Sequence, residues 1–89
     1  MVKAKNSFEI LRSRIVGAQD TLPKRLAEAA GYVLANPDEI ALGTTASIAK
    51  AAQVQPSTLV RLAHHLGYEG FSDLQQVFRE RLMARASSY

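Results

Sequence analysis

The feature that most constrains this chain is residues 44–67, where two short helical patterns flank a tight turn. Ala49 falls where the two helices would cross, and only a small side chain fits there. Val54 follows five residues later in the turn, and Leu59 follows five residues after that, where it would fill the gap between the helices. This spacing predicts a helix-turn-helix. Such a turn usually has glycine at the position of Gln53, because the backbone there has a positive φ, so glutamine would cost up to about 1–2 kcal/mol.

The second helix of this pair, about residues 56–66, has two chemically different sides. At about 100° per residue, one side is apolar and consists of Leu59, Leu62, Ala63 and Leu66. The other side has only polar groups and one cation, and its members are Ser57, Thr58, Arg61, His64 and His65. Short hydroxyls near a helix N-terminus suit phosphate and base contacts, and arginine suits guanine or phosphate. A solvated face would have the same periodicity, so the pattern alone leaves both interpretations open.

Charge is distributed unevenly along the chain. The 89 residues have a net charge of +3 and a pI near 9.6, which permits nucleic-acid binding without requiring it. Between residues 44 and 68 the only charged side chains are Lys50 and Arg61, and carboxylates are absent, as on a surface that faces phosphates. The candidate DNA-binding residues are Thr45, Lys50, Gln55, Ser57, Thr58, Arg61, His64 and His65.

Apolar residues elsewhere recur at helical spacing, and no segment alternates like a strand. We therefore predict an all-α fold, a compact bundle of about five helices in one domain spanning residues 1–89. Outside the pair, the predicted helices cover residues 8–17, 22–34 and the segment after 72, with one helical turn at 37–41; residues 1–6 and 86–89 are expected outside helices. The predicted boundaries are N-caps at Ser7, Thr21, Thr44 or Thr45, and Ser72, and glycine ends at Gly17 and Gly67.

The composition argues against several classes of function. The chain has no cysteine, which excludes disulfides and thiolate metal sites. No apolar run approaches the ~20 residues that span a bilayer, and no secretory signal is visible, so a cytoplasmic protein is expected. Adjacent His64 and His65 would point about 100° apart on a helix, so no shared metal is expected. No nucleophile–base set or glycine-rich phosphate loop is visible, so neither enzyme activity nor a cofactor is expected.

Residues 36–74 resemble the N-terminal DNA-binding domain of RpiR-type bacterial transcriptional regulators. The matching runs are Ala-Asn-Pro-Asp-Glu-Ile-Ala at 35–41, Ser-Ile-Ala-Lys-Ala-Ala at 47–52, the turn at Val54, Ser-Thr-Leu-Val-Arg at 57–61 and Leu-Gly-Tyr-Glu-Gly-Phe-Ser-Asp-Leu at 66–74. The predicted helix at 22–34 fits as well, so the resemblance covers nearly the whole chain. Family members usually have serine at the position of Gln55, and basic residues near His64 and His65, where this chain departs from them.

The resemblance implies a helical bundle with an embedded helix-turn-helix that tends to dimerise. Full-length members carry a C-terminal sugar-isomerase-type domain that senses phosphorylated sugars, and they act mostly as repressors of sugar or related catabolic genes. The expected partners are therefore double-stranded DNA and a second copy of the chain. A sugar phosphate would act only through that C-terminal domain, which is absent from this chain. The chain is therefore expected to be a fragment of a longer protein, with a stand-alone domain as the alternative.

Two functional classes remain open from the sequence. The first is a sequence-specific, dimeric DNA-binding domain, in which Thr45 and Lys50 hold phosphates. In this class the major groove is faced by Ser57, Thr58, Arg61 and His65. The second is a helical dimerisation or protein-interaction module that makes no DNA contact, in which the polar side of residues 56–66 is only solvated.

Overall fold

The computed structural model describes the backbone of residues 3–87 and the side chains of residues 8–86. Six α-helices and no strands occur in this described part, which confirms the all-α prediction. They are α1 (Lys3–Ala18), α2 (Lys24–Ala35), α3 (Pro37–Leu42), α4 (Thr45–Ala52), α5 (Pro56–His65) and α6 (Phe71–Ser87). The helix beyond the predicted five is α3, where the expected turn at 37–41 forms a six-residue helix. None of the described helices is long and apolar enough to cross a membrane.

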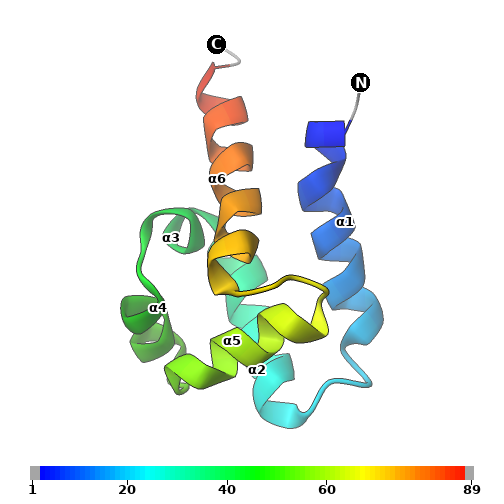
Figure 1. Cartoon of the computed structure of the whole chain (residues 1–89), viewed down its shortest axis with the longest axis vertical. Coiled ribbons are helices and arrows are strands. Elements are labelled where there is room, and N and C mark those ends of the chain that lie inside the picture. Colours follow the sequence, from blue (N-terminus) through cyan, green and yellow to red (C-terminus); the bar gives the residue numbers. More distant parts are fainter. Residues whose placement is uncertain (1–2, 88–89) are drawn as a thin grey trace.

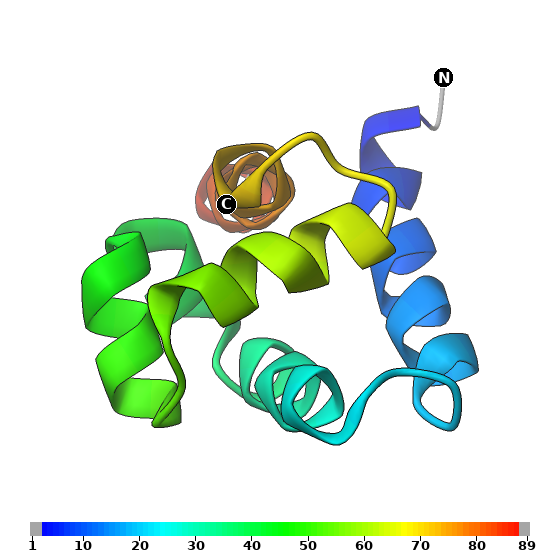
Figure 2. The same ribbon diagram turned by 60° about the horizontal axis from the view of Figure 1, so that its bottom comes forward.

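The helices are arranged so that α5 lies at one end of the molecule. α1 and α6 pack side by side, and the beginning of α1 and the end of α6 lie together at the opposite end (Figure 1). α5 runs between α4 on one side and α1 on the other, and it packs over α2 (Figure 2). α3 packs against α6, which brings α4 to the side of α5. The helix-turn-helix is thus held on a scaffold of four other helices.

A single apolar cluster fills the space between these helices. Its largest fully buried members are Leu11, Ile15, Val33, Ile40, Ile48, Leu59, Leu62, Leu74 and Phe78. Full burial of each such side chain stabilises the fold by roughly 1.5–3 kcal/mol. The ring of Phe78 meets that of Phe8 edge-on, with centroids 5.3 Å apart and an interplanar angle of 86°, and this contact joins α6 to α1.

Both predicted boundaries of the first helix are wrong. α1 begins at Lys3 rather than after an N-cap at Ser7, whose side chain lies outside the described residues. It also continues past Gly17 to Ala18, and Gly17 lacks the positive φ of a glycine cap. Ile15, in this last turn, is fully buried, so packing against the core keeps the turn helical despite the glycine.

The predicted N-caps of α2 and α6 are also wrong. The Thr21 hydroxyl donates a hydrogen bond back to the Ala18 carbonyl (3.1 Å), and Pro23 occupies the N-cap position of α2. α6 begins at Phe71, before the predicted cap at Ser72, and it continues into the segment expected outside helices. Only 3% of Phe71 is exposed, so burial of its ring holds the first turn of α6 in place.

The predicted helix-turn-helix is present as α4 and α5. Thr44 caps α4 in a capping box. Its hydroxyl accepts a hydrogen bond from the Ser47 N–H, and the Ser47 hydroxyl accepts one from the Thr44 N–H, each with a donor–acceptor distance of 3.0 Å. Ala49 is 2% exposed at the helix crossing and Leu59 is fully buried, as their spacing predicts. Val54 lies in the turn, where it is partly buried and packs against the core.

The turn contains the expected left-handed residue. Gln53 has φ 62° and ψ 43°, and it is the only residue other than glycine with a positive φ in the described part of the chain. Its N–H donates to the Lys50 carbonyl (3.1 Å) and the next N–H, from Val54, donates to the Ala49 carbonyl (2.9 Å). The turn is therefore closed by backbone hydrogen bonds, while its one side chain at positive φ remains strained.

We expect the substitution Gln53→Gly to stabilise the domain by about 0.5–1 kcal/mol. Glycine has no Cβ to clash in the left-handed region, although part of the gain is lost to the greater freedom of the unfolded chain. Thermal unfolding followed by circular dichroism should show a midpoint raised by roughly 2–8 °C. Gln53→Ala removes the same side chain but keeps the Cβ, so a glycine variant no more stable than the alanine variant would contradict this account.

Candidate nucleic-acid interface

The exposed face of α5 consists of one side of the helix and the residue at its N-cap. Ser57, Arg61 and His64 are exposed on it at successive turns. Val60 adds an apolar side chain that is 37% exposed between them. Gln55, at the N-cap of α5, is also exposed, and its side chain makes no capping hydrogen bond. The face therefore presents hydroxyl, amide, guanidinium and apolar groups that a single ligand could contact together.

Thr58 does not belong to this face, contrary to the sequence prediction. Its side chain is buried, with only 9% of the residue exposed. On a helix, position 58 lies about 100° around from Ser57, whereas Arg61 lies only about 40° from it. Thr58 therefore falls beside Leu62, one turn further along, which is fully buried. Thr58 packs at the edge of the core and is not available to a groove.

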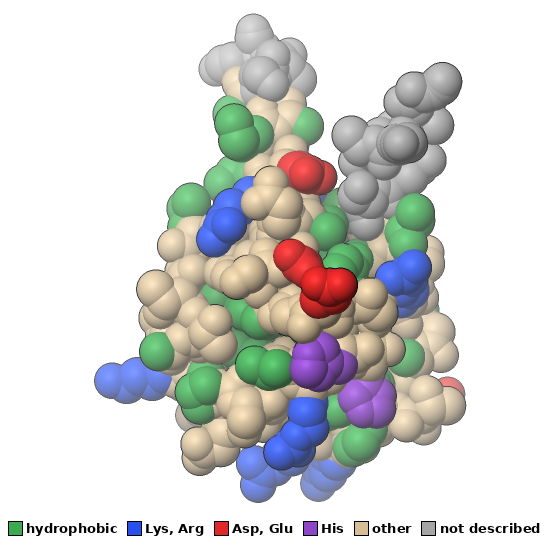
Figure 3. Space-filling model, viewed as in Figure 1, with side chains coloured by type: hydrophobic (Ala, Val, Ile, Leu, Met, Phe, Trp, Pro, Cys, Tyr) green, Lys and Arg blue, Asp and Glu red, His purple; other side chains and the backbone are tan. Residues whose placement is uncertain are grey.

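The adjacent histidines have different surroundings. The His64 Nε2–H donates to the Glu69 carbonyl oxygen over 2.9 Å, which ties α5 to the connector before α6. His65 lines a shallow hollow of about 420 Å³ together with Arg14 and Gly67. Figure 3 shows the two imidazoles next to each other, with Lys and Arg side chains below them and carboxylates above. Among the described residues, no three His, Cys, Asp or Glu side chains gather into a metal-binding group.

A glycine turn ends α5, as predicted. Gly67 has φ 92°, and its N–H donates to the His64 carbonyl (3.0 Å). The N–H of Tyr68 reaches back to the Ala63 carbonyl (2.9 Å), which completes a Schellman motif. A side chain on residue 67 would be strained by the positive φ, so glycine is the residue that fits here.

The same end of α5 is held by α1. The Arg14 guanidinium donates through Nη1 to the Leu66 carbonyl over 2.8 Å. It also lies 6.0 Å from the ring centroid of Tyr68, where burial raises the pKa of the phenol and the positive charge of Arg14 opposes that shift. This cation on a C-terminal carbonyl is favourable with the helix dipole. Arg14 was not identified from the sequence because its partner lies 52 residues away.

The end of α3, just before α4, is held by α6. Gln75 Nε2 donates to the carbonyls of Ile40 (3.0 Å) and Gly43 (2.8 Å), and Arg79 Nε donates to the Ala41 carbonyl (3.1 Å). The carbonyls of the last turn of a helix have no partner within it, so α6 supplies the missing donors for α3. A Cβ on Gly43 would lie 2.9 Å from a backbone oxygen of α3, which explains the glycine at this close approach.

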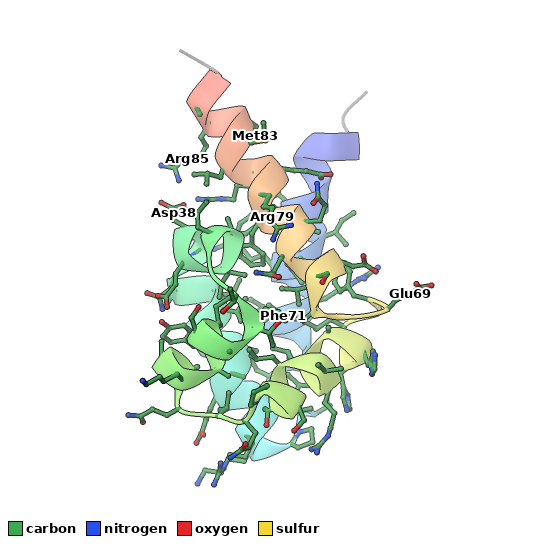
Figure 4. All side chains as sticks on the ribbon, turned by 60° about the vertical axis from the view of Figure 1, so that its left-hand side comes forward. Asp38, Glu69, Phe71, Arg79, Met83 and Arg85 are labelled. Atoms are coloured by element: carbon green, nitrogen blue, oxygen red, sulfur yellow. The ribbon has the colours of Figure 1, made fainter. Side chains whose placement is uncertain are left out.

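The cations of the described side chains divide into two groups by partner. Those with a partner in the fold are Arg12 with Glu9, Arg14 and Arg79 with backbone carbonyls, and Arg81 and Arg85 with Asp38. Figure 4 shows Arg79 and Arg85 on the side formed by α3 and α6, with Asp38 close to Arg85. Within residues 8–86, those without an ion pair or hydrogen bond to the protein are Lys24, Arg25, Lys50 and Arg61. The cations of α6 are therefore engaged in the fold, and the unpaired cations lie on α2, α4 and α5.

Two of the candidate DNA-binding residues, Thr45 and Lys50, lie on α4. Thr45 is the first residue of α4 and is partly buried, whereas Lys50 lies in the last turn and is exposed. Lys50 therefore lies next to the turn that leads into α5, whereas Thr45 lies at the other end of α4. The structure thus brings Thr45, Lys50, Gln55, Ser57, Arg61 and the two histidines to the α4–α5 end of the molecule.

Comparison with known proteins agrees with this geometry. The family model described as the helix-turn-helix domain of the rpiR family matches residues 9–85. A similar solved structure is the N-terminal domain of ybbH, an inferred transcriptional regulator from Bacillus subtilis subsp. subtilis str. 168. Its TM-score is 0.67 and its sequence identity 28%, over 80% of this chain and 82% of that chain. No curated protein sequence matches the chain. The chain belongs to the rpiR family of helix-turn-helix domains and is a DNA-binding regulatory domain.

Proposed function

We propose that the domain recognises a specific operator by inserting α5 into the major groove. Arg61 would pair with guanine O6 and N7, Ser57 would bond to a base edge or phosphate, and Val60 would contact a thymine methyl group. The observation that carries this proposal is the exposed guanidinium of Arg61, which has no partner among the described residues and lies in a stretch without carboxylates. Val60 was not a candidate from the sequence, because an apolar residue on a helix is ordinarily assigned to the core.

The phosphate contacts on one side of the groove are assigned to α4 in this proposal. Lys50 is exposed and unpaired within the described residues, and Thr45 offers a hydroxyl in the first turn of α4. Gln55 would reach the DNA from the N-cap of α5. His64 and His65 lie at the other end of α5, where they would approach the DNA backbone rather than the centre of the groove. No catalytic role is proposed for any of these groups.

The operator is proposed to consist of two half-sites bound by a homodimer. Dimeric helix-turn-helix proteins bind half-sites one helical turn apart, about 10–10.5 bp. Ile10 and Val16 leave 47% and 62% of their surface exposed on α1, which supplies apolar area for a second copy. The resemblance to sugar-responsive regulators supports sugar or related catabolic genes as the regulated genes. It also supports a cytoplasmic location for the domain. A sugar phosphate would act through a separate sensing domain of the full-length protein.

Selection of binding sites from a random duplex library tests this function. The wild-type domain is expected to enrich inverted repeats, and Arg61→Ala is expected to bind the enriched site about 5- to 150-fold more weakly, the loss of one base contact of about 1–3 kcal/mol. Selection repeated with the variant should show relaxed preference at one position of each half-site. Fluorescence anisotropy gives the affinities.

The matched control is Arg12→Ala. Arg12 is also an exposed arginine, but it lies on α1 and within 3.9 Å of Glu9. It should change the affinity for the enriched site by less than about twofold, because exposed ion pairs contribute little. Equal losses in the two variants, or no enrichment by the wild-type domain, would contradict recognition through α5.

A further inference from the structure

We propose that Lys24 and Arg25 form a second phosphate-binding patch, which holds the DNA strand on the opposite side of the groove from Lys50. This inference rests on the proposed function, because it takes α5 to lie in the major groove. It extends the interface to α2, an element that the sequence analysis treated only as scaffold. The partner is the sugar–phosphate backbone, so the contact would be independent of base sequence.

Position is the first support for this patch. α2 packs directly against α5 through its apolar side, where Leu26 is 2% exposed. Lys24 and Arg25 immediately precede Leu26 and are both exposed, at the start of α2. Figure 2 shows α4 beside one end of α5 and α2 below α5, so the two helices border different sides of it, and Figure 3 shows Lys and Arg side chains gathered at this end of the molecule. A helix in the major groove has one phosphate backbone on each side, so α4 and α2 are placed to meet one each.

Unsatisfied charge is the second support. Lys24 and Arg25 have no ion pair or hydrogen bond within the described residues, in contrast to the arginines of α1 and α6. Glu28 lies one turn further along α2, but no ion pair forms between it and either cation. Within the described residues, Lys24 and Arg25 are therefore left without a direct charge partner, as are Lys50 and Arg61.

The third support is that the fold gains nothing from these charges. Both cations lie in the first turn of α2, which contains no acidic residue. The N-terminal end of a helix carries a partial positive charge, so cations there are unfavourable for the folded state. Two unpaired cations at an electrostatically unfavourable position are explained by an anionic partner, and double-stranded DNA is the anion that α5 brings alongside.

The test compares salt dependence in the variant Lys24→Gln/Arg25→Gln. The probes are a fluorescein-labelled 20-bp duplex of arbitrary sequence and the duplex enriched by selection, each titrated between 50 and 200 mM KCl. Loss of two phosphate contacts should make the slope of log K against log [KCl] shallower by about 1.8 and should weaken binding to both duplexes about tenfold or more at 150 mM. The midpoint of thermal unfolding should stay the same or rise, because the helix dipole is relieved.

The matched control is Arg12→Gln/Arg85→Gln, which also removes two exposed cations but takes them from α1 and α6. Its salt slope should equal that of the wild-type domain. If the α2 variant has the same slope and affinity as this control while Arg61→Ala still loses affinity, the patch is overturned and recognition through α5 stands. If the wild-type domain binds neither duplex in a salt-dependent way, the proposed function is overturned and the patch with it.

Discussion

Replacing Gln75 by leucine is expected to destabilise the domain by about 2–4 kcal/mol. Gln75 is 5% exposed, and its amide is the shared donor for the carbonyls of Ile40 and Gly43. Leucine has a similar volume but no donor, so two carbonyl oxygens at the end of α3 lose their partner, each at a cost of roughly 1–3 kcal/mol. Thermal unfolding should show a midpoint lowered by about 10 °C or more.

The neighbouring glutamine provides the control for this prediction. Gln76 is exposed on the same helix, so Gln76→Leu should change stability by no more than about 0.5 kcal/mol. Gln75→Glu keeps the shape of the side chain but turns its donor into a carboxylate that faces two carbonyl oxygens, and it should destabilise at least as much as leucine at neutral pH. A Gln75→Leu midpoint within about 2 °C of that of Gln76→Leu would mean that water replaces the amide.

The second large effect is expected at Leu59, where Leu59→Ala should lower the free energy of unfolding by about 2–5 kcal/mol. Leu59 is fully buried between α4 and α5, so its truncation removes apolar contacts and leaves a cavity at the helix crossing. Urea denaturation should show a lower midpoint with an unchanged m value. Under conditions where the variant is still folded, its affinity for the enriched operator should also fall, because the angle between α4 and α5 is no longer fixed.

Val60→Ala is the matched variant, one residue further along α5. Val60 is 37% exposed, so its truncation should cost less than about 1 kcal/mol of stability. Any loss of operator affinity by this variant would then come from the DNA contact itself. Similar losses of stability in Leu59→Ala and Val60→Ala would contradict the role of Leu59 as the residue that fills the crossing.

Much of the fold could be predicted because the signals are local. The spacing of Ala49, Val54 and Leu59 defines a helix-turn-helix within 11 positions, and the left-handed residue of its turn follows from the same motif. Gly67 and the capping threonine before α4 are likewise short-range features. The cap at Thr21 failed because its hydroxyl bonds back to the Ala18 carbonyl, and the cap at Ser72 failed because burial of Phe71 places the start of α6 one residue earlier.

The site could be predicted only in part, because its support is long-range. Arg14 bonds to the end of α5, and Gln75 bonds to the end of α3 just before α4. Their partners lie 32–52 residues away in the sequence, so no local pattern predicts these contacts. Thr58 was misassigned because it was grouped with the polar side of α5, although it falls beside the buried Leu62 one turn further along. The separation of paired from unpaired cations is also visible only once α2, α3 and α6 are placed in space.

The hydrogen bonds from Gln75 and Arg79 fix the first half of α6 to the end of α3, so a rotation of α6 is transmitted to the rest of the domain. With its 17 residues, α6 is about 25 Å long. Since its first turns are bonded to α3, a tilt of the helix would carry α4 and α5 along with it. A rotation of about 10° displaces the far end of such a helix by about 4 Å, close to the 3.4 Å rise of one base pair. In the proposed dimer, a rotation of one copy by this angle about the end of its α6 would thus be enough to move its α5 out of register with its half-site.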